Sequence, residues 1–323
     1  WTATQVSVPY VVPVSPRSDR SFHRLLVRYM MRADVYDDEG MSVSADKFGL
    51  SEYNLSWIES LAIRVLKQGP IPRHLAVIMD GNRRYARLHQ RKTIEGHKRG
   101  FTKLMHLLNW CCRMGIEEVT VYAFSIENFK RSQDEVNALM SLAEEKLREI
   151  LKEARTFQQD RVAIRIIGNM SYLPDSLRKV CEELIEETKA GTKYFFNIAM
   201  AYTSREEICM AINSVLSKAK EGTVTEDQFD EALLSSAMYS HQSPDPDLLV
   251  RTSGEVRLSD FLLWQTSFSV VEFIRPLWPE LSLWSFLGSI VHFQWQAYMI
   301  RNCKYQKSLM SQTNQPTFKT KTL

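Results

Sequence analysis

Short apolar runs alternate with longer amphipathic stretches over most of this chain, and this alternation limits the fold more than any other feature. The apolar runs predict strands at residues 75–79, 119–124, 163–167, 195–200, 248–250 and 270–274. The amphipathic stretches predict helices at residues 84–88, 100–114, 133–157, 176–189, 204–220 and 226–236. Alternating strands and helices form a mostly parallel sheet with helices on both faces. We therefore predict one α/β domain, with a mostly parallel six-stranded sheet flanked by helices.

The ends of the chain differ from the folded domain, which we expect to span residues 70–300. Residues 1–50 contain several prolines and little apolar periodicity, so we expect a weakly ordered N-terminal extension. The printed sequence opens with Trp1, and an authentic start at Met30, Met31 or Met41 is an alternative. Residues 301–323 carry five basic side chains and no acidic one, so they form a basic tail.

Residues 51–69 predict an amphipathic helix ahead of the domain. Apolar residues recur at helical spacing from Leu55 to Leu66, and the pattern stops at Gly69 and Pro70. Such a helix either packs on its own domain or lies on a bilayer surface, and the sequence leaves both alternatives open.

Residues 281–300 form a second apolar segment, twenty residues long and without a formal charge. That length is sufficient to cross a bilayer. The segment also contains three serines, a histidine and two glutamines, whose polar groups are costly to leave unpaired in lipid. We therefore predict an aromatic-rich helix that is buried at a domain or subunit interface.

The overall charge excludes some classes of partner and leaves others open. The chain has 41 Lys and Arg against 38 Asp and Glu, a formal net charge of +3, so we expect no nucleic-acid partner.

Its five cysteines form no CxxC pair and no even framework, which indicates reduced thiols in an intracellular protein.

Arginine follows three of the predicted strands. Asp80, Gly81, Asn82, Arg83 and Arg84 follow the first, Ser125, Asn128 and Arg131 follow the second, and Arg251, Arg257 and Ser259 follow the fifth. Ligands of open α/β sheets bind at the carboxyl ends of the strands, so these side chains are expected to converge on one site.

The first of these segments has the composition of a phosphate site. Residues 80–99 hold seven Lys and Arg against Asp80 and Glu95. A glycine turn that enters a helix offers free N–H groups to an anion, and arginine forks match phosphate oxygens. Asp80 within this cluster suits a Mg²⁺ ion shared with the phosphates. The alternative, a solvated helix face, is less favoured because two other strand ends also carry arginine.

Several common motifs are missing from the sequence. No GxG spacing and no Gly-Lys pair occur, so the Rossmann and Walker A fingerprints are absent. HExxH and GxSxG are absent as well. A diphosphate site without a nucleotide motif points to phosphorylated small molecules or lipids.

Three long segments resemble the signatures of the cis-prenyltransferases. They are residues 74–86 with Gly96 and His97, residues 122–131, and residues 247–265. The resemblance extends over roughly residues 52–300, in order, which makes 70–300 the expected catalytic domain. Within the family, the chain looks more similar to the eukaryotic dehydrodolichyl diphosphate synthase subunits than to the bacterial undecaprenyl diphosphate synthases.

The resemblance implies that isopentenyl diphosphate is condensed onto an allylic diphosphate such as farnesyl diphosphate. The product would be a long-chain dehydrodolichyl diphosphate for dolichol and protein glycosylation, made at the cytoplasmic face of the endoplasmic reticulum by a peripheral protein. It also implies an apolar product tunnel, with the helices at residues 100–114 and 133–157 as its walls.

The resemblance also implies a role for each residue that matches a family motif. Asp80 would hold Mg²⁺ and assist departure of the leaving group, and Asn128 and Ser125 would lie near the reacting carbons. The allylic diphosphate would be held by Gly81, Asn82, Arg83, Arg84, His97 and Arg131. Isopentenyl diphosphate would be held by Arg251, Arg257 and Ser259.

The sequence departs from the family pattern at three places. Thr93 stands where bacterial relatives have an arginine, which Arg91 or Lys92 could replace. Val270 stands where they have a metal-binding glutamate, and Glu272 lies two residues further on. No Arg-x-Gly motif follows Leu281, so we expect a Nogo-B receptor-like partner subunit to supply it.

Two other functions are weighed against catalysis of this kind. A non-catalytic scaffold subunit of the same fold would lose the run from Asp80 to Arg84, which is intact. A phosphatase that uses Asp80 would need a second aspartate two residues later, where this chain has Asn82.

Overall fold

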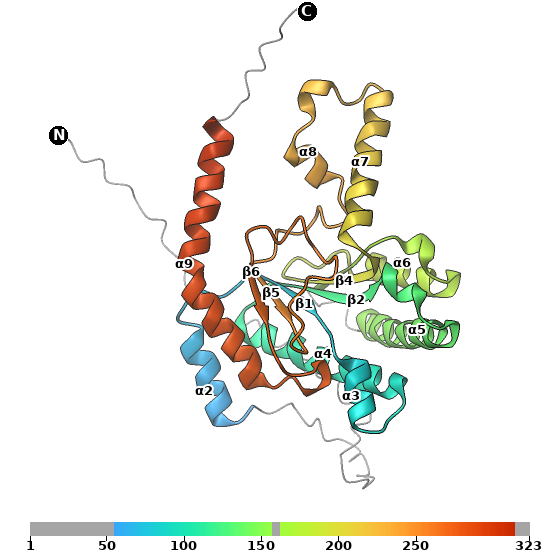
Figure 1. The fold of residues 1–323 in the computed structure, drawn as a ribbon, viewed down its shortest axis with the longest axis vertical. Helices are drawn as coiled ribbons and strands as arrows, with labels where there is room; N and C mark the ends of the chain where they lie inside the picture. Colours follow the sequence, from blue (N-terminus) through green and yellow to red (C-terminus); the bar gives the residue numbers. More distant parts are fainter. Residues whose placement is uncertain (1–54, 157–161, 314–323) are drawn as a thin grey trace, which may run out of the picture.

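Six parallel strands form one sheet, in the order β3-β4-β2-β1-β5-β6 (Figure 1). The computed structural model describes residues 55–156 and 162–313, so the prediction for residues 1–50 lies outside the described residues. The strands are β1 (His74–Ile78), β2 (Glu118–Ser125), β3 (Val162–Ile167), β4 (Tyr194–Tyr202), β5 (Leu248–Arg251) and β6 (Val270–Phe273). The predicted six-stranded sheet is therefore confirmed, and it is wholly parallel.

Helices link the strands in the predicted alternation. They are α3 (Asn82–Leu88), α4 (Thr93–Met114), α5 (Gln133–Thr156), α6 (Asp175–Thr188), α7 (Ser204–Lys220) and α8 (Glu231–Ser236). Helix α4 begins seven residues earlier than predicted, which places His97 inside the helix. The predicted helix at 226–236 is wrong as one element: a 3-10 turn covers Glu226–Gln228, and Asp230 then caps α8 through the N–H of Leu233.

The central strand β1 separates two cores. All five of its residues are buried, because parallel strands in this class of fold are covered on both faces. Leu75 and Val77 belong to the larger core, together with residues of α4, α5, α6 and the C-terminal helix. Ala76 and Ile78 belong to the smaller core, where Phe261 packs on the sheet.

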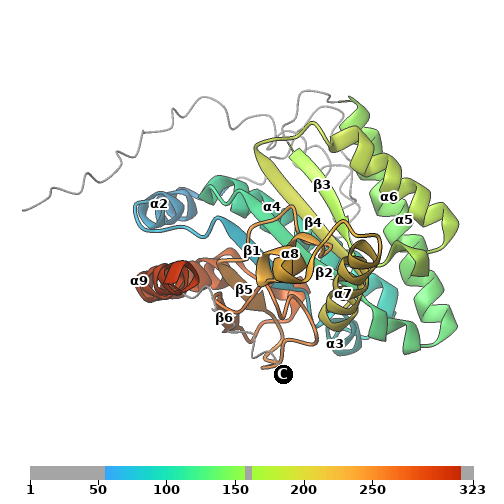
Figure 2. The ribbon, with the colours of Figure 1, turned by 90° about the horizontal axis from the view of Figure 1, so that it is seen from above.

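Two further helices, α2 (Trp57–Leu66) and α9 (Leu283–Thr313), lie side by side at one edge of the molecule (Figure 2). Ser56 caps α2 in a capping box with Glu59, and Gln294 of α9 donates a hydrogen bond of 2.7 Å to the carbonyl of Leu66. The prediction that residues 281–300 form a buried helix holds for one face only. Phe286 and Ile290 are buried, whereas the Trp295 side chain is 85% exposed.

Helix α9 continues past Ile300 to Thr313, so residue 300 is not the end of an element. None of the helices in the described ranges is both long enough and apolar enough to cross a membrane.

Candidate active site

One cavity of about 970 Å³ opens at the carboxyl ends of the strands. Its polar lining residues lie at these strand ends, and its apolar ones come from α4, α5 and the sheet. All of the residues that the sequence assigns to substrate or metal line it. They are Asp80, Gly81, Asn82, Arg83, Arg84, His97, Ser125, Asn128, Arg131, Arg251, Arg257 and Ser259. The expected convergence of three strand ends is therefore borne out as geometry, while the role of each residue stays a prediction.

Asp80 is fixed by its own backbone. Its N–H donates to Oγ1 of Thr252 (3.0 Å), and its carbonyl accepts from that hydroxyl (2.6 Å) and from the N–H of Trp278 (2.9 Å). The next residue, Gly81, has a φ of 115°, and a Cβ there would lie 3.0 Å from the Leu277 side chain. Glycine is thus required for the turn that leads from β1 into α3.

The carboxylate of Asp80 lies between two arginines. Arg251 donates to Oδ2 at 2.8 Å, and a nitrogen of Arg84 lies 3.5 Å from the same oxygen. Burial raises the pKa of Asp80, but the hydrogen bond and charge of Arg251, the charge of Arg84 and a hydrogen bond from Ser253 together lower it below its usual value. Asp80 is therefore ionised at neutral pH, as a metal ligand must be.

A second carboxylate, Glu255, neutralises part of the basic cluster. It pairs with Arg257 and lies 3.6 Å from Arg84. Arg84 also donates to the hydroxyl and the carbonyl of Ser253. Several of the arginines are thus held in place by groups that an incoming phosphate would replace.

His97 and Arg131 form a separate part of the polar wall. Arg131 lies 3.0 Å from Glu135, and the Arg83 guanidinium is 4.0 Å from the same oxygen. Burial, helped by the charges of Arg131 and Arg83, lowers the pKa of His97 to about 4. Its Nε2 is buried and has no hydrogen-bond partner among the residues that the structure describes. A neutral imidazole with an unused nitrogen is suited to a polar ligand in the cavity.

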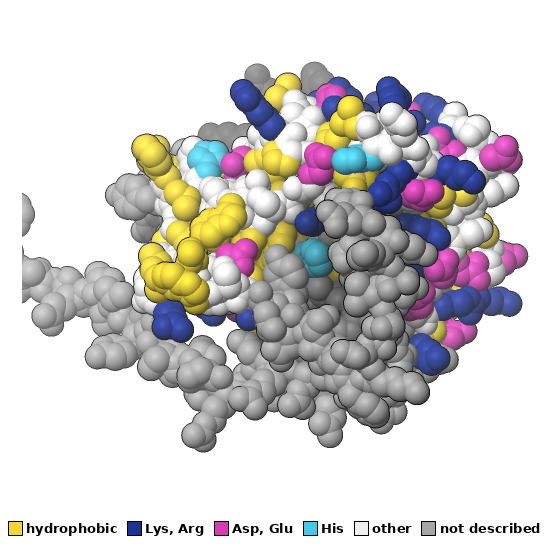
Figure 3. All heavy atoms as spheres, turned by 90° about the horizontal axis from the view of Figure 1, so that it is seen from below, with side chains coloured by type: hydrophobic (Ala, Val, Ile, Leu, Met, Phe, Trp, Pro, Cys, Tyr) yellow, Lys and Arg dark blue, Asp and Glu magenta, His cyan; other side chains and the backbone are white. Residues whose placement is uncertain are grey.

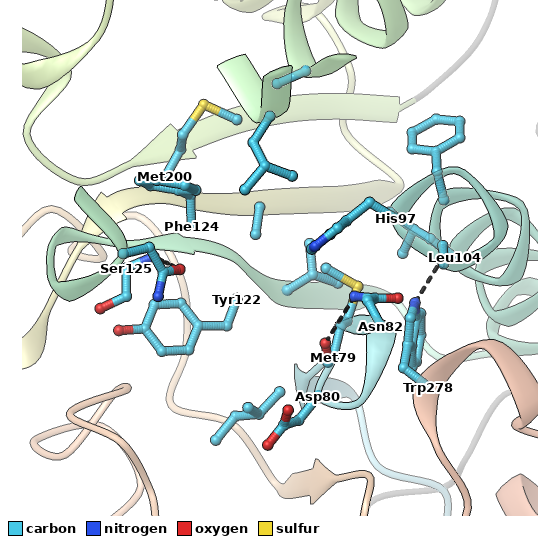
Figure 4. A pocket seen from close by; sticks show the side chains of 18 of the residues that line it. Met79, Asp80, Asn82, His97, Leu104, Tyr122, Phe124, Ser125, Met200 and Trp278 are labelled. Atoms are coloured by element: carbon cyan, nitrogen blue, oxygen red, sulfur yellow. Dashed lines mark hydrogen bonds between the residues drawn. The ribbon is translucent and has the colours of Figure 1, made fainter. Parts of the chain in front are cut away.

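Ser125 and Asn128 hold the turn at the end of β2. The Ser125 hydroxyl accepts from the N–H of Glu127 (3.2 Å), and the Ser125 N–H donates to the Asn128 side chain (3.1 Å). In Figure 4, Ser125 lies across the cavity from Asp80, Asn82 and His97. A substrate between them would contact both sides.

The apolar part of the cavity has the walls that the sequence predicts. They come from α4, α5, β2 and β4, and include Phe101, Leu104, Leu139, Leu142, Ala143, Leu147, Ile150, Phe124, Phe196 and Ile198. Polar side chains thus lie at one end of a single space and apolar ones along the rest.

The donor groups limit which metal site can form. In the described ranges no three His, Cys, Asp or Glu residues are grouped as a metal centre. Mg²⁺ is commonly held by one or two carboxylates together with substrate phosphates. Asp80 fits an ion that is shared with a diphosphate, and does not fit a site built from protein groups alone.

The residues that could replace the family side chains missing at Thr93 and Val270 do not line the cavity. Arg91 and Lys92 are not among its lining residues, whereas Arg87 is. Glu272 lies 3.7 Å from His292 of α9 and is also absent from the lining, so it does not replace the glutamate missing at Val270.

Several residues of the site were not predicted from the sequence. Trp278 borders the cavity and donates its indole N–H to the carbonyl of Gly100 at 2.7 Å (Figure 4). Arg205, Asp260 and Lys146 also line the cavity. Asp260 lies within the third signature, residues 247–265, directly after Ser259.

Comparison with known proteins bears on these observations. Residues 78–301, more than half of the chain, match the family model described as "Putative undecaprenyl diphosphate synthase". The chain belongs to the cis-prenyltransferase family. The match confirms the resemblance that the three motifs show. Cis-prenyltransferases are enzymes.

Relatives of this cis-prenyltransferase come from distant organisms. The dehydrodolichyl diphosphate synthase complex subunit DHDDS of Homo sapiens is 46% identical over 245 residues, which cover 76% of this chain and 74% of the human protein. A tritrans,polycis-undecaprenyl-diphosphate synthase (geranylgeranyl-diphosphate specific) of Thermococcus kodakarensis is 41% identical over 73% of this chain and 89% of its own.

A solved structure agrees with the fold. The crystal structure of lavandulyl diphosphate synthase from Lavandula x intermedia, in complex with dimethylallyl diphosphate, superposes with a TM-score of 0.66 at 34% identity. The match covers 69% of this cis-prenyltransferase and 95% of the plant chain.

Proposed function

We propose that this cis-prenyltransferase condenses isopentenyl diphosphate onto an allylic diphosphate such as farnesyl diphosphate, and that repeated cycles give a long-chain dehydrodolichyl diphosphate. The observation that carries the proposal is one continuous cavity with arginines from three strand ends at its mouth and apolar walls beyond them. The 46% identity to the human DHDDS subunit supports the choice of product class.

The allylic diphosphate would bind at the end of β1. The N-terminus of α3 and the side chains of Arg83, Arg84 and Arg131 supply positive charge there, and Asn82 and His97 supply polar contacts. Charge that is already arranged around a leaving group stabilises the negative charge that develops as its carbon–oxygen bond breaks. The electron pair of that bond would leave with the diphosphate.

Isopentenyl diphosphate would bind beside it, held by Arg251, Arg257 and Ser259. Its double bond would attack the allylic carbon, and loss of a proton from the new unit would form the cis double bond. Ser125 lies across the cavity from Asp80 in Figure 4, and Asn128 lines the same cavity, so both would flank the reacting carbons.

Asp80 would hold a Mg²⁺ ion together with substrate phosphate oxygens. When bound, such an ion neutralises charge on the departing diphosphate. The lowered pKa of Asp80 keeps its carboxylate charged for this role at neutral pH.

The growing chain would occupy the apolar part of the cavity. The walls from α4 and α5 offer only hydrocarbon over much of its length, which suits an isoprenoid product.

The active enzyme would be a heteromer with a Nogo-B receptor-like subunit that supplies an Arg-x-Gly motif. Support comes from the human relative, which is named as a subunit of a complex. The proposed location is the cytoplasmic face of the endoplasmic reticulum membrane.

Peripheral membrane contact would be made by the apolar surface of α2 and α9. Apolar side chains gather there in Figure 3, and Trp57 is 75% exposed. The exposed members are Trp57, Ile58, Leu61, Val65, Trp284, Val291, Trp295 and Met299. Co-sedimentation with liposomes tests this contact, and replacing Trp57 and Trp295 by serine should weaken it.

The central test is an assay with labelled isopentenyl diphosphate, farnesyl diphosphate and Mg²⁺, on the chain alone and with its partner. We expect labelled polyprenyl product with the partner and little without it. Asp80→Ala should abolish turnover while substrate binding largely survives. Equal rates for Asp80→Ala and wild type would refute the role of Asp80, and robust synthesis by the single chain would refute the heteromer.

A further inference from the structure

In the loop after β5, residues 253–263, several residues other than glycine have positive φ angles, which strain the backbone. Ser253, Ser259, Asp260 and Leu262 have φ angles of 79°, 51°, 61° and 47°. They are four of the six non-glycine residues with positive φ in the described part of the chain. Strain of this kind persists only where surrounding contacts hold it.

The N-terminus of α7 supplies such contacts, and Asp260 receives most of them. The Asp260 carbonyl accepts from the N–H of Ser204 at 2.8 Å. Its carboxylate accepts from the N–H of Arg205 at 3.1 Å and from Nε of Arg205 at 2.8 Å. The N–H of Leu263 returns a bond of 2.7 Å to the Ser204 hydroxyl. The first N–H groups of a helix lack partners within it, so acceptors in the loop bind the first N–H groups of α7. The same hydrogen bonds fix the loop.

The same loop reaches Asp80 from its other side. Arg251 donates to the Ser259 hydroxyl at 2.7 Å and to the carbonyl of Arg257, and another of its nitrogens donates to Asp80 at 2.8 Å. Hydrogen bonds therefore link α7 to Asp260, and others link its chain neighbour Ser259 through Arg251 to the proposed metal ligand.

We infer that Asp260, with Arg205, is a positioning pair for the isopentenyl diphosphate site. It holds Ser259 and Arg257 where they meet the diphosphate. Asp260 is suited to this because its side chain is only 12% exposed, whereas that of Arg205 is 76% exposed and borders the cavity. The inference rests on the proposed function, since it deepens the use of the same site.

A purely structural cap would stabilise α7 without favouring one substrate. A positioning role makes a different prediction, because the loop carries the residues proposed for isopentenyl diphosphate and none of those proposed for the allylic substrate. The KM for isopentenyl diphosphate should therefore change while the KM for farnesyl diphosphate stays nearly constant.

The test uses the full chain together with its partner subunit. Asp260→Gly removes the carboxylate and also removes the strain at φ 61°, so any loss comes from the missing contacts. We expect its KM for isopentenyl diphosphate to rise about tenfold, with the KM for farnesyl diphosphate within about twofold. Asp260→Asn keeps an acceptor for the Arg205 N–H and tolerates positive φ, so it should stay within about threefold of wild type.

Two controls keep the result clear. Asp230→Gly removes the aspartate cap of α8, which does not line the cavity, and should leave both KM values unchanged. If Asp260→Gly does not fold, Arg205→Gln removes the side-chain contact alone and should raise the same KM severalfold. An unchanged KM for isopentenyl diphosphate in the folded variant, or equal rises for both substrates, overturns the inference. Wild-type protein that forms no product overturns the proposed function instead.

Discussion

Arg251 donates a hydrogen bond of 2.8 Å to Oδ2 of Asp80 from a side chain that is only 4% exposed. The same guanidinium reaches Ser259 and the carbonyl of Arg257. One planar group thus joins the end of β1 to the loop after β5. A diphosphate that binds Arg251 would compete with Asp80 for it and release the carboxylate toward a metal ion.

Arg251→Lys keeps the positive charge but removes the planar set of hydrogen bonds to Asp80, Ser259 and Arg257, because an ammonium cannot bond three groups in a plane. We expect kcat/KM for isopentenyl diphosphate to fall about 100-fold, the scale seen when one preorganised donor is lost. Steady-state kinetics with labelled substrate measure it. Arg73→Lys, at a position that is 78% exposed and does not line the cavity, is the comparison and should lose far less. Wild-type kcat/KM in Arg251→Lys would contradict the prediction.

Trp278→Phe should destabilise the chain without removing much apolar volume. The indole N–H donates to the carbonyl of Gly100 within α4, and Trp278 is almost fully buried, so the variant removes one buried hydrogen bond. The expected loss in the free energy of unfolding is about 0.5–1.5 kcal/mol. Urea denaturation measures it, with the half-exposed Trp284→Phe as the control that should change little.

Gly96→Ala and Gly288→Ala form a matched pair of helical substitutions. A Cβ at Gly96 would lie 2.3 Å from the backbone oxygen of Asn82, whereas nothing lies within 4 Å of one at Gly288. Overpacking of this kind costs about 1–3 kcal/mol. Alanine at the open position should gain about 0.5–1 kcal/mol. Thermal unfolding of the two variants should therefore shift in opposite directions, and a shift in the same direction would refute the close contact of α3 with α4.

The stability of the fold should fall as the pH drops from 6.5 toward 4. The pKa of His97 in the folded chain is lowered to about 4 by burial and nearby arginines, from an ordinary value of 6.5. Between these values the unfolded chain binds a proton that the folded chain does not, so acid favours unfolding. His97→Gln should reduce the loss between pH 7 and pH 5 by about 2 kcal/mol. Denaturant melts at the two pH values measure this.

His89→Gln is the control for that experiment, since His89 is exposed near the end of α3. His97→Gln should change the pH dependence of the free energy of unfolding more than His89→Gln does. An equal effect of the two substitutions would show that burial of His97 is not the cause.

The strands and the residues at their ends were predictable because each depends on local pattern. Apolar runs mark buried parallel strands, and the topology of such sheets brings their carboxyl ends together. Asp80, Arg131 and Arg251 could therefore be assigned to one site before any coordinates. The apolar walls from α4 and α5 were expected from the family resemblance and not from this pattern.

Contacts made through the backbone could not be predicted in this way. The hydroxyl of Thr252 and the N–H of Trp278 hold Asp80 by its backbone N–H and carbonyl, so the side-chain type at position 80 gives no signal for these contacts. The break before α8 depends on a single capping aspartate, Asp230, inside a pattern that otherwise reads as helix. Glu272 lies on the predicted strand. Its side chain is directed toward His292 of α9, a contact that the strand pattern does not predict.

The position of β1 in the sheet has a consequence for synthesis on the ribosome. Leu75 pairs with Val119 on one side and with Leu248 on the other, so the first strand to emerge is bonded on both edges only after most of the chain has been made. Until then a strand with four consecutive apolar residues has an open edge that can pair with another nascent chain. Truncated chains that end before β5 should therefore be aggregation-prone rather than partly active.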